Sequence, residues 1–94
     1  MSRQDDRREK VYVEVEVDFN ESGRMVPLAI ILDGSRFEID KVKQVCQAAS
    51  RRVGGQGDRY TIMVLGKETY LFFERNASLS GDNIGRWFVE KRIA

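Results

Sequence analysis

The pattern of apolar and polar positions is densest in residues 59–75, where two apolar runs flank Gly66 and Lys67. A glycine at the first central position suits a two-residue type II′ turn, so the pattern predicts a hairpin that pairs Ile62 with Leu71. Directly opposed residues share a face. One face then carries Tyr60, Ile62, Val64, Leu71 and Phe73, and the other carries Met63, Tyr70 and Phe72. A hairpin that is apolar on both sides lies in the middle of a sheet or barrel, or presents one face to a partner.

Residues 11–19 alternate strictly between apolar and polar side chains, and this period of two predicts a strand. Its core side carries Val11, Val13, Val15, Val17 and Phe19, and its solvent side carries Tyr12, Glu14, Glu16 and Asp18. A turn over residues 20–24 leads to a second strand over residues 25–32. Pro27 cannot donate a hydrogen bond to a neighbouring strand, so we expect it near a strand start, a bulge or an edge.

Asp33-Gly34 is the strongest short hairpin signal in the chain. A two-residue turn there pairs Leu32 with Ser35, Ile30 with Phe37 and Leu28 with Ile39. In this register all the large side chains fall on one side of the hairpin, so turn chemistry and apolar pattern agree.

Residues 40–53 fit two structures. Their apolar spacing suits a helix that begins at Asp40 and ends at Gly54, but the β-branched residues favour a strand. We favour a bent strand that reaches about Ala48, with a bulge near Asp40 and Lys41. Residues 50–58 and 76–85 are predicted loops, and residues 86–92 are the last strand, with Trp87 and Val89 on one side and Phe88 and Glu90 on the other.

Together these elements predict an all-β fold of about six antiparallel strands in a meander. A sheet of this size must curl or close to hide its edges, so we expect a small SH3-like barrel, or alternatively a strongly curved sheet with one helix. Residues 1–10 are mostly charged and are expected to be disordered, which leaves residues 11–94 as a single β domain.

Composition excludes several chemistries. The chain of 94 residues has no histidine and one cysteine, Cys46, so histidine-assisted catalysis, the usual zinc sites and an internal disulfide are all excluded. We expect Cys46 to be a buried filler, and we expect no catalytic residue, metal or cofactor. The N-terminus lacks the apolar core of a secretory signal and no apolar run could span a membrane, so a cytoplasmic protein with no membrane partner is expected.

The net charge of +1 gives no global attraction for nucleic acid, but positive charge is concentrated in residues 41–60. Guanidinium groups and glycine N–H groups placed together in a loop can hold a phosphate. The alternative is a flexible connection that needs glycine for its turns. The candidate anion-binding or nucleic-acid-binding residues are Lys41, Lys43, Arg51, Arg52, Gly54, Gly55, Gly57 and Arg59.

A second candidate site is aromatic. By strand parity a set of large side chains lies on the face opposite the predicted core, where it could stack nucleic-acid bases or be covered by loops, by a second layer or by a dimer partner. This candidate interaction face contains Tyr12, Met63, Tyr70, Phe72 and Phe88.

Several segments resemble those of small, uncharacterised bacterial domains, some of which are encoded near Y-family DNA polymerases of the damage response. The segments are Asp33-Gly34, Phe37-x-Ile39-x-x-Val42, Tyr60, Tyr70-Leu-Phe-Phe-Glu74 and Gly85-Arg-Trp-Phe-Val-Glu90. The resemblance spans about residues 26–90 and implies an all-β domain without known catalytic residues. The loop at residues 76–85 is longer here than in those domains.

Two functions follow as hypotheses. The first is a non-catalytic binding module for nucleic acid or for a repair complex. The second is a protein–protein or self-association domain, including a homodimer, that uses the aromatic second face. Phosphate contacts make affinity fall steeply with salt and apolar contacts do not, so salt dependence separates the two.

Overall fold

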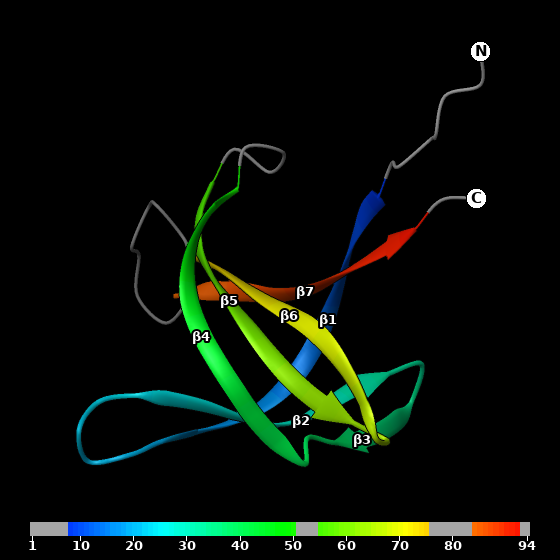
Figure 1. Cartoon of the computed structure of the whole chain (residues 1–94), viewed down its shortest axis with the longest axis horizontal. Helices are drawn as coiled ribbons and strands as arrows, with labels where there is room; N and C mark the ends of the chain where they lie inside the picture. The colour runs from blue at the N-terminus through cyan, green and yellow to red at the C-terminus, as the bar shows by residue number, and fades with distance from the viewer. Residues whose placement is uncertain (1–7, 51–54, 76–83, 93–94) are drawn as a thin grey trace.

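The computed structural model describes residues 8–50, 55–75 and 84–92, and in this part of the chain every regular element is a β-strand. Seven antiparallel strands form one sheet in the order β3-β2-β1-β7-β6-β5-β4, curled into a half-barrel (Figure 1). Among these residues no helix is long and apolar enough to cross a membrane. The strands are β1 (Arg8–Phe19), β2 (Met25–Leu32), β3 (Ser35–Glu38), β4 (Lys41–Ser50), β5 (Gly55–Val64), β6 (Lys67–Arg75) and β7 (Gly85–Arg92).

The prediction of an all-β antiparallel fold is confirmed, with seven strands in place of about six. The meander is broken between β3 and β4, which follow each other in the chain but lie at opposite ends of the sheet order. The first and last strands instead pair with each other, from Arg8 opposite Arg92 to Val13 opposite Trp87.

The short connection between β3 and β4 bends the sheet. A flat sheet of seven strands would separate its edges by about 29 Å, whereas the chain from Glu38 to Lys41 spans at most about 11 Å. The connection is held on both sides, because the amide of Ile39 donates to Leu28 at 2.9 Å and the amide of Asp40 donates to Met63 at 2.8 Å. The sheet must therefore curl until its two edges meet at this end, as Figure 1 shows.

The core lies on the concave face of this curl. Ile62 and Leu71 are fully buried, and the Trp87 ring packs 4.9 Å from Phe73 and 5.1 Å from Tyr60, measured between ring centroids. The Tyr60 hydroxyl donates to the carbonyl oxygen of Met25 at 3.3 Å, and burial raises its pKa above the ordinary value. The predicted division of the last strand, with Trp87 inward and Phe88 outward, is confirmed.

The first hairpins follow the predicted pattern with one exception. Asp33 and Gly34 both have positive φ, and the register pairs Ile30 with Phe37 as expected. Leu28, however, does not share the buried side of Ile30: it is 44% exposed. The reason is a bulge, because Glu16 lies opposite Ala29 and Val17 opposite Pro27, which leaves Leu28 as the extra residue. Pro27 thus stands beside a bulge, one of the places expected for it.

The predicted register of the β5–β6 hairpin is wrong. Its turn consists of Leu65 and Gly66, with φ of 53° and 76°, and Ile62 pairs with Thr69 and not with Leu71. The slip is two residues, so every side chain keeps its predicted face. The predicted register would place Asp58 directly opposite Arg75; in the observed register Asp58 lies opposite Phe73, and the Asp58–Arg75 ion pair still forms, at 2.9 Å.

Glycine at position 57 also favours this register. Gly57 lies opposite Glu74, where an added Cβ would overlap the carbonyl oxygen of Phe73. The slipped hairpin therefore requires a glycine at that position, and the chain provides one.

Three predicted boundaries also move. Residues 40–53 contain a strand, as favoured, but its bulge lies between Val42 and Gln44, and it reaches Ser50. Gly55 and Gly57 belong to β5 and not to a loop. Residues 8–10, expected to be disordered, extend β1 because they pair with β7; residues 76–83 of the second predicted loop lie outside the described residues.

The turn at Leu65 is open to a direct test. A left-handed conformation costs a non-glycine residue roughly 1–2 kcal/mol, and asparagine tolerates it better than leucine. Because Leu65 is 76% exposed, little packing is lost on substitution. We expect Leu65→Asn to raise the free energy of unfolding by about 1 kcal/mol in urea titrations.

Leu65→Ala is the control, because alanine removes the same side chain but keeps the strain. If the asparagine variant is no more stable than the alanine variant, the turn does not adopt the left-handed conformation.

Candidate functional site: the outer aromatic face

A row of aromatic side chains crosses the face of the sheet that is turned away from the core, which we call the outer face. Phe88 of β7 stacks on Phe72 of β6, with ring centroids 5.0 Å apart and planes 7° apart. Tyr12 of β1 meets the edge of Phe88 at 5.9 Å, and Tyr70 meets Phe72 at 6.5 Å. We call Tyr12, Phe88, Phe72 and Tyr70 the aromatic row.

Strand register builds this row from residues far apart in the chain. Tyr12 lies opposite Phe88, and Phe88 lies opposite Phe72, so three neighbouring strands each contribute one ring at the same level. Of the five predicted residues the structure brings together these four. Met63 shares the outer face but stands opposite Glu68, farther along the sheet.

Accessibility differs along the row. Phe88 is only 2% exposed, whereas Tyr12 is 38% and Tyr70 is 41% exposed. The middle of the row is therefore covered by its neighbours, and the two tyrosines at its ends are open to a ligand.

Cationic side chains lie over the rings. The guanidinium carbon of Arg86 is 3.4 Å from the centroid of Tyr12, and that of Arg59 is 4.7 Å from the centroid of Tyr70. The ammonium group of Lys10 lies 5.0 Å from the centroid of Phe88. Cations are attracted to aromatic faces in this range. The outer face thus combines aromatic and cationic groups, as binding surfaces commonly do.

Sequence reasoning missed Lys10 and Arg86. Each stands two positions from a ring on its own strand, so period-two parity would have placed both on the outer face. The charged composition of residues 1–10 predicts disorder, so it gives no signal for Lys10.

Glu74 of β6, also missed, joins the row to β1. Lys10 Nζ is 2.7 Å from Glu74 Oε1, and the Tyr12 hydroxyl donates to the same oxygen at 3.0 Å. The hydrogen bond from Lys10 holds the pKa of Glu74 below its ordinary value. Burial alone would lower the pKa of Lys10, but its bonds to Glu74 and Tyr12 raise it overall.

Other cations of the outer face are paired with carboxylates. Arg36 contacts both carboxylate oxygens of Glu16, at 3.0 and 3.1 Å, and Lys43 lies 2.9 Å from Glu68. Arg8 lies 3.6 Å from Glu90. Positive and negative charges therefore alternate over this face, and no strongly basic stripe forms among the described residues.

The residues predicted for the anion site do not form a glycine-rich loop in the part of the chain that the structure describes. Arg51, Arg52 and Gly54 lie outside the described residues. The backbone of Gly57 is paired on both sides, with Ala48 of β4 and Glu74 of β6, so a glycine loop with free N–H groups does not form there. Gly55 likewise pairs with Ser50.

The basic side chains of that site are spread along the sheet. Lys41 begins β4, Lys43 pairs with Glu68, and Arg59 stacks on Tyr70. The Nε of Arg59 is buried and has no hydrogen-bond partner within the described part of the chain. Cys46, predicted as buried filler, is a half-buried free thiol opposite Arg59 on β4, because β4 is an edge strand.

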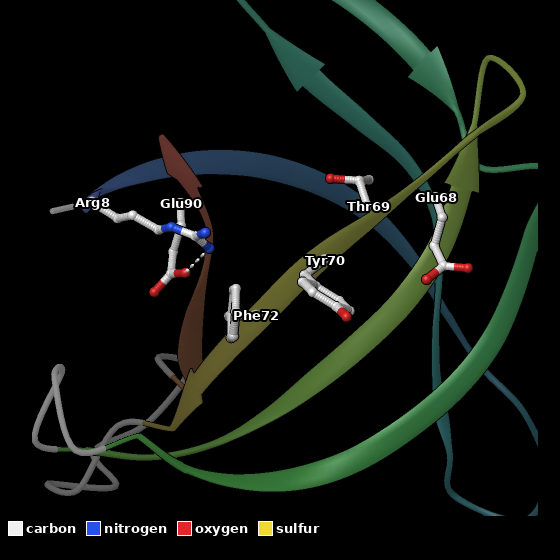
Figure 2. A pocket seen from close by; sticks show the side chains of 6 residues that line it. All are labelled: Arg8, Glu68, Thr69, Tyr70, Phe72 and Glu90. Atoms are coloured by element: carbon white, nitrogen blue, oxygen red, sulfur yellow. Dashed lines mark ion pairs between the residues drawn. The ribbon is translucent and has the colours of Figure 1, made fainter. Parts of the chain in front are cut away.

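A shallow hollow of about 240 Å³ adjoins one end of the row (Figure 2). Tyr70 and Phe72 form its aromatic walls, and side chains from β1, β6 and β7 complete it. Its lining residues are Arg8, Glu68, Thr69, Tyr70, Phe72 and Glu90. Across the described residues no group of histidine, cysteine, aspartate or glutamate side chains is arranged to hold a metal ion.

The Glu74 contacts predict a pH dependence. A carboxyl group whose folded pKa is lowered contributes stability above its unfolded pKa, ordinarily 4.5 here, and that stability is lost as pH falls through the lower folded value. We expect Glu74→Gln to lower the free energy of unfolding at pH 7 by roughly 0.5–1 kcal/mol, because the pair is partly exposed. The variant should also lose less stability than the wild type as pH falls below about 4.5.

Urea titrations at several pH values test this, with Lys10→Met and the double variant completing a double-mutant cycle. Methionine keeps an apolar stem over Phe88 while removing the charge. A coupling energy of zero between positions 10 and 74 would show that the ion pair does not stabilise the fold.

Comparison with protein-family models, with characterised proteins and with solved structures finds no match to this chain. Its function is therefore inferred from the outer face itself.

Proposed function

We propose that the protein is a non-catalytic binding module that docks a partner protein through the aromatic row. The observation that carries this proposal is the charge balance of the outer face, where Lys10, Lys43, Arg36 and Arg8 each lie beside a carboxylate. Surfaces that bind nucleic acid are strongly positive, whereas protein interfaces favour aromatic residues and arginine. Exposed tyrosines beside arginines are typical of the residues that dominate binding energy at protein interfaces.

A second copy of the chain is one such partner. A two-fold interface brings the same patch of both copies together and must be self-complementary. A face with alternating charges meets that condition, and a strongly basic face does not. The resemblance to domains encoded near Y-family polymerases makes a repair complex another setting for the same face. The absence of histidine from the chain favours binding over acid–base catalysis.

The proposal predicts the behaviour of Tyr70→Glu. Tyr70 is 41% exposed, so the variant should remain folded, but a carboxylate at the end of the row should abolish docking. Phe19→Glu is a matched control, because Phe19 is a 59% exposed aromatic residue outside the row. Circular dichroism checks folding, and sedimentation equilibrium measures self-association. Binding of other proteins is measured by pull-down from nuclease-treated cell extracts.

The proposal is supported if the protein self-associates, or binds defined proteins from the extract, and if this binding persists in Phe19→Glu but disappears in Tyr70→Glu. If the wild type stays monomeric and all three proteins retain the same set of partners, the row is not a docking surface.

One observation favours a second candidate, single-stranded nucleic acid. Arg59 and Arg86 form no ion pair within the described residues, and both stack on exposed tyrosines. Bases stack on aromatic side chains beside such cations in proteins that bind single strands. This candidate moves the predicted nucleic-acid site from the glycine-rich segment to the aromatic row.

We expect any such binding to be weak, salt-dependent and insensitive to base sequence. In a titration of a labelled single-stranded oligonucleotide at low salt, replacing Arg59 and Arg86 with glutamine should lower both the affinity and the salt slope, by about 0.7 for each lost phosphate contact. A duplex of the same sequence is the comparison. Absence of binding at tens of micromolar protein, or equal binding by the double variant, removes this candidate.

A further inference from the structure

We propose that the hollow lined by Tyr70, Phe72, Glu68 and Glu90 is a binding site for the guanidinium group of an arginine side chain. That this arginine belongs to a docked protein rests on the proposed function above. The site itself rests on the chemistry of its walls.

The aromatic walls suit an organic cation. The rings of Tyr70 and Phe72 lie 6.5 Å apart and meet at 63°, so together they form a corner and not a flat surface. The outer face already shows the same chemistry within the chain, because Arg86 lies over Tyr12 and Arg59 over Tyr70. Because Arg59 already lies over one face of Tyr70, a cation that enters the hollow would stack on the other face of that ring or on Phe72.

Two carboxylates border the hollow on opposite sides, Glu90 beside Arg8 and Glu68 beyond Tyr70 (Figure 2). Their present ion pairs are weak. Arg8 lies 3.6 Å from Glu90, longer than a charge-assisted hydrogen bond, and the Lys43–Glu68 pair is about half exposed, at 44% and 48%. Each carboxylate has a second oxygen and can accept a further donor without losing its partner.

Charge decides between the ligands that could enter. A phosphate would face two carboxylates, and the nearby cations are already engaged, Arg8 with Glu90, Lys43 with Glu68 and Arg59 with Tyr70, which disfavours it. An apolar side chain would desolvate the carboxylates without a hydrogen bond in return. A guanidinium group is planar, stacks on aromatic rings and donates several hydrogen bonds in one plane, whereas an ammonium group is more strongly hydrated and does not stack.

The test titrates the isotopically labelled protein with a blocked Gly-Arg-Gly peptide and follows its amide resonances. We expect shifts at Glu68, Tyr70, Phe72 and Glu90 that saturate with a dissociation constant on the order of millimolar, because one side chain supplies all the contacts. The same peptide with citrulline has nearly the same shape without the charge, and it should leave these resonances in place.

Two variants locate the site. Glu68→Gln and Tyr70→Ala should each weaken binding by roughly threefold or more. Glu16→Gln is the matched control, because Glu16 lies on the same face but its partner is Arg36, outside the hollow. The dispersion of the amide spectrum shows whether each variant is folded.

Three outcomes overturn the inference: equal binding of the citrulline peptide, equal binding of a Gly-Lys-Gly peptide, or shifts that lie outside the hollow. The result is independent of the docking test. Arginine binding without any docked protein leaves the site standing and removes the proposed function, and docking without arginine binding does the reverse.

Discussion

The connection of two residues between β3 and β4 forces the whole sheet to curl. It joins the two ends of the strand order, so the sheet cannot lie flat. Hydrogen bonds from Ile39 and Asp40 to two different strands hold the curl in place. The concave face that results is where Ile62 and Leu71 lose all contact with water, and burial of such apolar surface is the main favourable term in folding.

The same curl places the candidate site. Pairing of β1 with β7 fills the centre of the sheet, and strand parity then sends Trp87 inward and Phe88 outward. On β6 the neighbours Phe73 and Phe72 divide in the same way. The aromatic row is therefore the reverse side of the core, and the tight packing of one supports the geometry of the other. A rigid platform of this kind orders few groups on binding, which lowers the entropic cost.

The outer face carries both cations that contact aromatic rings and cations that are paired with carboxylates. Its rings hold Arg59 and Arg86, its carboxylates pair with Arg8, Lys10, Arg36 and Lys43, and the net effect is a surface without a dominant charge. Such a surface gains little from long-range steering and must recognise its ligand by local fit. That requirement favours the proposed protein partner and a specific contact at the hollow, whose lining includes two aromatic walls and two carboxylates.

Period two and turn chemistry are local properties, so they predicted most of the strands, their faces and the Asp33-Gly34 turn, whereas residues 40–53 fitted either a helix or a strand. Of the five residues that the sequence predicted for the aromatic face, four form the aromatic row. The slipped register at Leu65, the strand position of Gly57 and the inclusion of Lys10 in β1 follow instead from the pairing of strands in the folded sheet. The inclusion of Lys10 depends on pairing with β7, which is distant in the chain. A slip of two residues in the β5–β6 hairpin leaves the apolar pattern unchanged, so the sequence pattern carries no signal that separates the two registers.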